Sequence, residues 1–274
     1  MYDNNRRHWD ERVAVHLAPG GYDLADLRAG RGRVSDLEEA ELAEIFGALA
    51  GRRIIHLQCH FGADTLGFAQ RGAEVVGVDF SPAGMATARR LADELGLSGR
   101  ARFVECNVYD APEAVGEAGT FDGVFVSWGA ITWLPDIGAW AQVVAHFLRP
   151  GGRLYLAEAH PTALVFDDLA EGTDGRPGWF APYFAREVVP FDDHGDYANP
   201  DAVLQHSQQY GWVHPMGDLL AALADTGLAL RFLREHDGVP WAMFRCLVRH
   251  ADGFYRWPDR PWLPLAFSLA AEKR

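Results

Sequence analysis

The chain has 274 residues, of which 49% are hydrophobic, so it is long enough to bury one large core with a substantial insertion. Its 38 Asp and Glu against 25 Lys and Arg give a formal net charge of −13, which disfavours nucleic acids and anionic membrane surfaces as partners. Cys59, Cys106 and Cys246 have no CxxC spacing, so neither a disulfide framework nor a metal site is expected. Without an apolar run of membrane length or a signal-peptide core, we expect a cytoplasmic protein.

The first fifty residues predict a helical segment in front of the main fold. The stretch SDLEEAELAEIFGALAG (35–51) is typical of a helix that Ser35 caps and Gly51 ends. The preceding stretch NRRHWDERVAVH (5–16) is expected either as a short helix or as a frayed terminus.

From Arg52 onward, short apolar runs alternate with helical segments. This alternation predicts parallel strands joined by right-handed crossovers, and therefore a doubly wound α/β sheet. The expected strands are RIIHL (53–57), EVVGVDF (74–80), ARFVECNVY (101–109), FDGVFVSW (121–128) and RLYLAEAH (153–160). The expected helices between them are 64–72, 82–96 and 136–152.

The alternation then breaks in a segment rich in Pro, Gly, Asp and aromatic residues. A segment of this length without regular elements is usually a lid or an insertion. Beyond it, we expect a helix at 216–227, strands at 228–236 and 264–273, the last of them antiparallel, and a helix at 241–255. The expected domains are an N-terminal helical cap (1–50), a ligand-binding core (51–160), a lid (161–213) and a C-terminal part that completes the sheet (214–274).

Polar residues follow the expected strands at their carboxyl ends, where ligands of open α/β sheets bind. The first strand runs into the tight turn QCHFG (58–62). The second ends at Asp79, whose carboxylate can accept both hydroxyls of a ribose, or can cap the next helix, although Ser81 is the usual choice for that position. The third is followed by Asn107, whose amide matches a purine edge, and the fourth ends at Ser127, Trp128 and Gly129.

In this order and spacing, the motifs IIHLQCHFG, VVGVDFS, FVECNVYDAPE, FDGVFVSWGAITWLPD and LRPGGRLYLAEAH resemble the class I S-adenosylmethionine-dependent methyltransferases. The resemblance runs from about Arg52 to Glu158. It implies a Rossmann-like methyltransferase sheet, mostly parallel with an antiparallel last strand, and S-adenosylmethionine as cofactor. The cofactor-binding residues that it implies are Gln58, Cys59, His60, Gly62, Asp64, Asp79, Phe80, Ser81, Asn107, Val108, Ser127, Trp128 and Gly129, together with Trp9 of the N-terminal segment.

The turn after the first strand departs from that family's pattern. His56 stands where an acidic residue usually helps to hold the cofactor's ammonium group, and Gln58 and His60 replace two glycines, so that only Gly62 remains. Because Gln58 and His60 lack glycine's access to positive φ, they are expected to adopt backbone conformations compatible with a side chain. His56 is expected to be a core histidine. A nicotinamide cofactor is disfavoured, because its pyrophosphate needs a glycine-rich turn for close backbone approach.

Several side chains have two open interpretations. Phe80 either belongs to the core or stacks on the adenine, and His60 either contacts the cofactor carboxylate or points to solvent. Trp128, with Trp133, either packs the following helix or presents an aromatic face to a sulfonium or a cationic substrate. If the N-terminal segment closes as a helix, Tyr2 and Trp9 would be its apolar contacts and Arg6 or Arg7 would pair with the cofactor carboxylate.

For catalysis, His160 is the first candidate base and His214 the second, among other candidates at Glu158, His194 and His206. The alternative is catalysis by in-line positioning alone. We expect methyl transfer to an O, N or S atom of a small molecule by a monomer or homodimer, with an apolar mouth formed by Trp179, Phe180, Tyr183, Phe184 and Trp212. The alternatives are a non-catalytic cofactor-binding module or sensor and a non-methyl transfer from the same cofactor.

Overall fold

The computed structural model describes residues 1–199 and 201–274 and has a seven-stranded sheet at its centre. The strand order is β10-β14-β5-β4-β1-β2-β3; the first five strands in sequence run parallel, and β14 is antiparallel to both of its neighbours. Strand order therefore reverses at β1, and the loops around it are where a ligand of such a sheet binds. The strands are β1 (Arg53–Leu57), β2 (Glu74–Asp79), β3 (Ala101–Glu105), β4 (Phe121–Ser127), β5 (Leu148–Ala159), β10 (Leu228–His236) and β14 (Ala266–Lys273).

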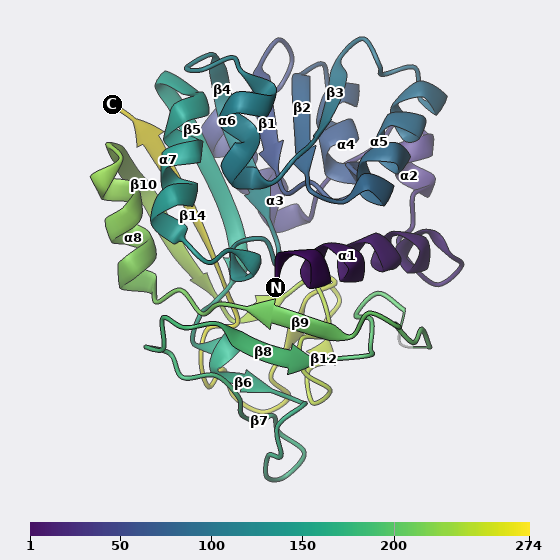
Figure 1. Cartoon of the computed structure of the whole chain (residues 1–274), viewed down its shortest axis with the longest axis vertical. Helices are drawn as coiled ribbons and strands as arrows, with labels where there is room; N and C mark the ends of the chain where they lie inside the picture. The colour runs from purple at the N-terminus through teal and green to yellow at the C-terminus, as the bar shows by residue number, and fades with distance from the viewer. Residues whose placement is uncertain (200) are drawn as a thin grey trace.

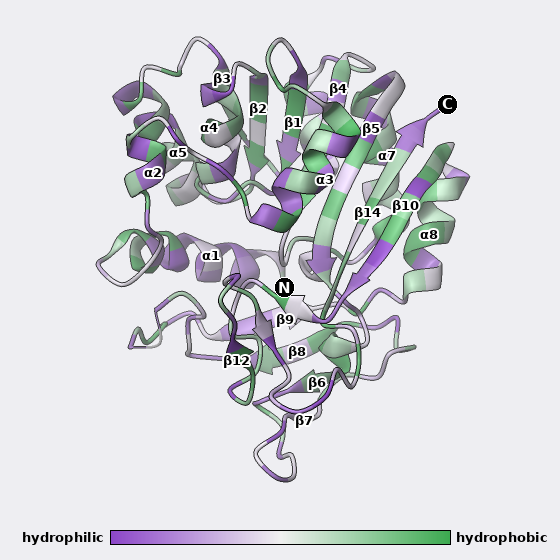
Figure 2. Ribbon diagram, turned by 180° about the vertical axis from the view of Figure 1, so that it is seen from behind, coloured by the Kyte–Doolittle hydropathy of each residue, from purple (hydrophilic) through white to green (hydrophobic). Residues whose placement is uncertain are grey.

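Helices cover both faces of this sheet (Figures 1 and 2). One core cluster joins α3, α4 and α5 to the sheet through residues such as Phe46, Leu66 and Leu91, and another joins α7 and α8 through residues such as Trp140 and Leu223. Buried on both faces, β2 and β4 are largely hydrophobic, as their colour in Figure 2 shows. The helices are α2 (Ala25–Arg28), α3 (Asp36–Phe46), α4 (Ala63–Gln70), α5 (Pro82–Glu94), α6 (Ala111–Val115), α7 (Ile137–Phe147) and α8 (Met216–Asp225).

The helix starts follow from capping side chains. Ser35 and Glu38 form a reciprocal capping box at α3, and the Ser81 hydroxyl accepts from the Gly84 N–H at α5, where Pro82 takes the first helical position. The Asp136 carboxylate accepts from the Ala139 N–H at α7. Ser81, rather than Asp79, is thus the cap of α5.

A long N-terminal helix, α1 (Tyr2–Leu17), lies between the carboxyl edge of the sheet and the lid (Figure 1). The lid holds two small antiparallel pairs, and a three-stranded sheet follows from the C-terminal part. The minor elements are η1 (Val108–Asp110), η2 (Ile131–Trp133), η3 (Ala163–Val165), β6 (Phe166–Asp167), β7 (Gly178–Trp179), β8 (Val189–Asp192), β9 (Gln208–Gly211), β11 (Gly238–Val239), β12 (Val248–Arg249) and β13 (Tyr255–Arg256).

The doubly wound sheet and its antiparallel last strand are confirmed, but three expected elements need correction. The helix expected at 241–255 is wrong, because Phe244 and Leu247 instead pack irregularly with Val239 and Leu265 in a separate cluster, flanked by β12 and β13. Helix α3 ends at Phe46, with Gly47 at φ 63°, rather than at residue 51. Helix α7 stops at Phe147, and β5 begins at once with Leu148.

None of the helices within residues 1–199 and 201–274 combines the length and the apolar character needed to span a bilayer.

Candidate active site

The turn between β1 and α4 keeps a glycine-type backbone without its glycines. Gln58 has φ 59° and His60 has φ 53°, both in the left-handed region, and Gly62 follows at φ 76°. The expectation that Gln58 and His60 avoid positive φ is therefore wrong. The left-handed conformation costs an L-residue about 1–2 kcal/mol of conformational free energy. Side-chain contacts offset this cost. The Gln58 amide donates to the Ala130 carbonyl at 2.6 Å, and the His60 ring lies 2.8 Å from the His16 ring.

Replacing Gly62 by alanine is expected to lower the free energy of unfolding by about 3 kcal/mol, from left-handed backbone strain plus overpacking. A Cβ there would lie 2.5 Å from Cε1 of the buried Phe103 ring. Gly96→Ala is the matched control, because Gly96 has a similar φ of 68° with nothing within 4 Å of the added carbon. Urea denaturation measures both; equal losses in the two variants would show that the loop has no close contact with Phe103.

Asp79 ties the end of β2 to this turn. Its carboxylate accepts from the His60 N–H at 2.9 Å and from the Ser81 N–H at 2.9 Å, and it is 8% exposed. Burial raises its pKa to about 6, although the hydrogen bonds to Ser81 and His60 oppose that shift. A carboxylate has about four lone-pair sites, so two remain for a ligand after the loop has been anchored.

The residues that follow β2, β3 and β4 differ in their contacts. The Asn107 side-chain carbonyl oxygen accepts from the Tyr109 N–H, and its amide nitrogen has no partner among the described residues. Val108 is 5% exposed and packs in the core on the α7 side. Trp128 has φ 41°, and its ring lies 5.8 Å from that of Trp241, while the half-buried Phe80 ring lies 6.0 Å from that of Tyr2 on α1.

Glu158 holds the turn after β4 rather than offering an acid or a base. It is 1% exposed, and its oxygens accept at 2.6–3.0 Å from four backbone N–H groups, those of Gly129, Ala130, Ile131 and Ala159. Burial raises the pKa of this carboxyl, while the four donors act against that rise. With both oxygens engaged, Glu158 is a positioning residue.

Helix α1 closes the site with a polar face. Asn5, His8, Arg12 and His16 lie on one side of the helix and are 0% to 6% exposed. Their partners are mostly in the lid: the Tyr210 carbonyl and N–H for Asn5, the His206 carbonyl for His8, and the Asp196 carboxylate for Arg12 and His16. On the sheet side, the Ser81 hydroxyl donates to Asp10 at 2.6 Å. The frayed-terminus alternative is excluded.

A buried chain of side chains runs from the lid to the cofactor turn. His16 Nε2 lies 3.0 Å from Asp196 Oδ2, and His16 Nδ1 lies 2.8 Å from His60 Nε2. Trp9 packs on the same ring, with 5.3 Å between the Trp9 and His60 centroids. Of the two interpretations of His60, exposure to solvent is therefore wrong, because its ring is held between α1 and the turn.

Replacing Asp196 by asparagine is expected to cost about 3 kcal/mol of folding free energy, because it leaves the buried Arg12 without its anionic partner. Although burial alone raises the pKa of Asp196, the hydrogen bond and charge of His16 and the charge of Arg12 lower it to about 2. The pKa in the unfolded chain is about 3.9. Since the folded-state pKa is the lower one, this stabilisation is present above about pH 4 and is lost as the pH falls towards 2.

Urea denaturation at pH 7 and near pH 3 measures that difference, with Asp174→Asn on an exposed turn as the control. A variant that loses as much stability near pH 3 as at pH 7 would contradict the role of the Asp196 charge.

Comparisons with known proteins agree with this geometry. Residues 54–152 match the family model of methyltransferase domains. The chain is 40% identical over 121 residues to a 23S rRNA (uracil(1939)-C(5))-methyltransferase of Nitrosospira multiformis, covering 43% of this chain and 26% of that protein. It is 28% identical over 156 residues to a ubiquinone biosynthesis O-methyltransferase of Methylocella silvestris, covering 57% and 58%.

The structural comparison agrees on the fold. An S-adenosylmethionine dependent methyltransferase from Mesorhizobium loti superposes with a TM-score of 0.57 at 19% identity, over 86% of this chain and 97% of that one. Residues 54–152 therefore match a methyltransferase domain, and the chain shares the fold of the S-adenosylmethionine-dependent methyltransferases. The first two relatives match over only 26% and 58% of their own lengths, so the chain spans part of each.

The residues of the site fit S-adenosylmethionine as cofactor. Three buried polar atoms around the turns after β1 and β4 have no partner among the described residues: Gln58 Oε1, Trp128 Nε1 and Trp133 Nε1. Buried polar atoms are normally hydrogen-bonded, so these atoms indicate a polar ligand between the turns and α1. No group of three or more His, Cys, Asp or Glu residues in the described part of the methyltransferase is placed to hold a metal ion.

The two histidines expected as bases differ in whether a ring nitrogen is left with a free lone pair. In His160, Nε2 lies 3.1 Å from Glu235 and Nδ1 accepts from the Thr162 N–H, so both ring nitrogens are engaged. In His214, Nε2 lies 3.1 and 2.8 Å from two carbonyl oxygens, those of Ile131 and Leu134, so it carries the proton and Nδ1 keeps its lone pair. Burial lowers the pKa of His214 and favours this neutral form. Between these two rings, only that of His214 keeps a nitrogen lone pair without a partner among the described residues, although the sequence placed His160 first.

The expected aromatic mouth is only partly assembled in the methyltransferase. Trp179 is 79% exposed and Phe184 is 73% exposed, so neither lines an enclosed pocket. Tyr183 instead binds the Met216 N–H at the start of α8, and Phe180 packs on Phe191 of β8. Trp212 and His214 line a cavity of about 10 Å³ beside Glu158, which is room for about one water molecule.

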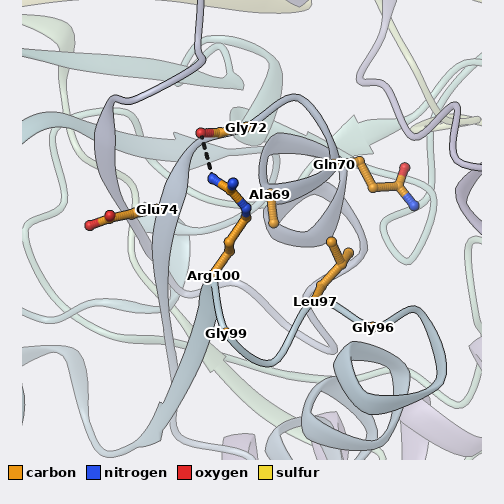
Figure 3. A pocket seen from close by; sticks show the side chains of 8 residues that line it. All are labelled: Ala69, Gln70, Gly72, Glu74, Gly96, Leu97, Gly99 and Arg100. Atoms are coloured by element: carbon orange, nitrogen blue, oxygen red, sulfur yellow. Dashed lines mark hydrogen bonds between the residues drawn. The ribbon is translucent and has the colours of Figure 1, made fainter.

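Another hollow lies at the opposite edge of the sheet in this methyltransferase. It offers about 590 Å³ near the amino ends of β2 and β3, where Arg100 donates to the Gly72 carbonyl at 3.3 Å (Figure 3). Ligands of open α/β sheets bind at the carboxyl ends, so this hollow is not the active site. Its lining residues are Ala69, Gln70, Gly72, Glu74, Gly96, Leu97, Gly99 and Arg100.

The residues missed by sequence reasoning lie mainly on α1 and its partner segment: Asp10, Arg12, His16 and Asp196. A signal was present, because Asn5, His8, Arg12 and His16 recur at helical spacing. It was missed because a buried helix face is normally recognised by apolar residues, and here that face is polar.

Proposed function

We propose that this chain transfers the methyl group of S-adenosylmethionine to an oxygen, nitrogen or sulfur atom of a small molecule. The observation that carries the proposal is the enclosure of the turns after β1 and β2 by α1, with Asp79 anchoring both turns. Such an enclosure suits a single cofactor molecule and a small acceptor better than a polymer. The net charge of −13 also disfavours a nucleic-acid substrate.

Within this proposal, each group at the strand ends has a role. Asp79 accepts the ribose hydroxyls, Asn107 presents its free amide to the adenine, and Phe80 and Tyr2 border the adenine. Trp9 and His60 close the site from the side of α1. When bound, the cofactor supplies an electrophilic sulfonium methyl group, and the acceptor's lone pair forms the new bond while S-adenosylhomocysteine departs.

Acid–base chemistry falls to His214 in this proposal. Its Nδ1 is the free acceptor, and its Nε2–H is fixed by two carbonyl groups, so the ring orientation is set. Among acceptors, a phenolic or quinol hydroxyl fits best, because it is flat and apolar and needs a base to ionise. The ubiquinone biosynthesis O-methyltransferase relative acts in the pathway that its name states, which supports this acceptor class.

The test is a product assay with mass spectrometry. The protein is incubated with S-adenosylmethionine and separate panels of phenols, amines, thiols and ribosomal RNA. We expect S-adenosylhomocysteine and a methylated phenol in equal amounts. Methylated RNA would instead favour the activity named for the rRNA methyltransferase relative. Cofactor binding without turnover on any panel would favour a non-catalytic module, and cofactor consumption without S-adenosylhomocysteine would favour a non-methyl transfer.

A further inference from the structure

Two carboxylates, Glu38 on α3 and Asp64 in the first turn of α4, have no cationic partner among the described residues. Glu38 is 3% exposed, and its Oε2 takes part in the capping box with Ser35. Its Oε1 has no hydrogen-bond partner in the part of the chain that the structure describes. Asp64, in the first turn of α4, forms no assigned hydrogen bond or ion pair within residues 1–199 and 201–274. Burial raises the pKa of Glu38 to about 7, and the neighbouring Asp64 charge adds to that rise. Burial also raises the pKa of Asp64 to about 6.

Within residues 1–199 and 201–274, no positive charge is among the groups that act on Glu38 or Asp64. The groups that act on Glu38 are Asp64, Ser35 and the Trp128 indole, which lies nearby but outside hydrogen-bond geometry. The Asp64 charge in turn reaches the hydroxyls of Tyr22 and Tyr197, which bond each other at 2.8 Å. Asp64 is half-buried at the start of α4. A carboxylate withdrawn from water without a partner is costly, so these two carboxylates favour a cation.

The sheet order indicates which part of the cofactor lies nearest to these two carboxylates. The ribose anchor proposed above, Asp79, ends β2, whereas Trp128 follows β4 on the other side of β1. A cofactor whose ribose lies at β2 and that crosses the β1 turn towards β4 presents its amino-acid end to Glu38, Asp64 and Trp128. We propose that Glu38 and Asp64 bind the α-ammonium group of S-adenosylmethionine. This inference rests on the proposed function.

The ammonium group fits better than the other cation of the cofactor. A sulfonium has no N–H or O–H to donate, so it cannot satisfy the free Glu38 oxygen, whereas an ammonium has three donors. The ammonium also supplies the charge-assisted hydrogen bonds that make a buried carboxylate favourable. His56 cannot take this role, because it is 3% exposed, is bonded to Thr65 and packs on Phe125, as expected of a core histidine.

The test is a calorimetric titration with three ligands. These are S-adenosylhomocysteine, its analogue with hydrogen in place of the α-amino group, and 5′-methylthioadenosine, which lacks the amino-acid part. The variants are Glu38→Gln, Asp64→Asn and the double variant. Glu38→Gln keeps the capping box, since Gln also serves at that position. Asp36→Asn is the matched control: the same helix loses one charge at a side chain that is 79% exposed.

Glu38→Gln is expected to weaken S-adenosylhomocysteine binding about 10- to 100-fold, the value of a charge-assisted hydrogen bond. Affinities for the deaminated analogue and for methylthioadenosine are expected to change less than about threefold, because they lack the group that the carboxylate binds. Thermal unfolding without ligand should show Glu38→Gln at least as stable as the wild type, since the substitution removes an unpaired buried acid.

Equal losses for all three ligands, or an unchanged affinity for S-adenosylhomocysteine in the double variant, would overturn the inference and leave the proposed function standing. If the wild type binds none of the three ligands, the proposed function fails together with the inference.

Discussion

Asp79→Ala is expected to weaken the binding of S-adenosylhomocysteine by at least about 100-fold. The substitution removes two hydrogen bonds between an ionised carboxylate and ribose hydroxyls, each worth about 1.5–3 kcal/mol. It also frees the N–H groups of His60 and Ser81, which hold the two turns in place. Isothermal titration calorimetry measures the loss directly.

The control for this variant is Glu105→Ala. Glu105 ends β3, stands opposite Asp79 in the sheet register, and is exposed. The Glu105→Ala substitution removes the same kind of charge from a neighbouring strand end without touching the turn after β1. Asp79→Asn should lie between the two, because one carbonyl oxygen remains to accept. Wild-type affinity in Asp79→Ala would contradict the assignment of the ribose to this residue.

Glu158→Ala is expected to lower the free energy of unfolding by about 5 kcal/mol. Four backbone N–H groups lose their acceptor in a buried turn, and each unsatisfied donor costs about 1–3 kcal/mol, part of which water recovers. The loss is comparable to the whole stability of many domains, so Glu158→Gln, which keeps one acceptor oxygen, is the milder companion variant. Its expected loss is about 2–3 kcal/mol.

Chemical denaturation followed by circular dichroism measures both variants. Glu272→Ala is the control, because Glu272 lies on β14 beside β5 and pairs with the half-exposed Arg153, a contact worth less than about 1 kcal/mol. If Glu158→Ala loses no more than Glu272→Ala, the Glu158 carboxylate does not hold the turn after β4.

The core sheet is predictable from the sequence because each parallel strand is buried on both faces and appears as a short apolar run. EVVGVDF and FDGVFVSW are such runs, and Ser81-Pro82 and Asp136 mark the starts of the helices that follow β2 and β4. The helix predicted at 241–255 was wrong, because its apolar residues are compatible with a helix locally but pack in an irregular hydrophobic cluster instead.

From the sequence, only those residues of the candidate site that directly follow a buried strand can be predicted. Asp79 follows from its place after a buried strand. The backbone conformation of Gln58 and His60 cannot be predicted in this way. Their positive φ is stabilised by contacts with Ala130 and with His16, which are distant in sequence. The sequence also does not predict that Glu38 is buried with one oxygen unpaired, because its position indicates only a capping residue.

The most direct test of the account is the titration of the wild-type protein with S-adenosylhomocysteine and NAD in parallel. The account predicts micromolar binding of S-adenosylhomocysteine at one site per chain, on the order of −8 kcal/mol, and no detectable binding of NAD. Binding of NAD, or no binding of S-adenosylhomocysteine at millimolar concentration, would contradict it.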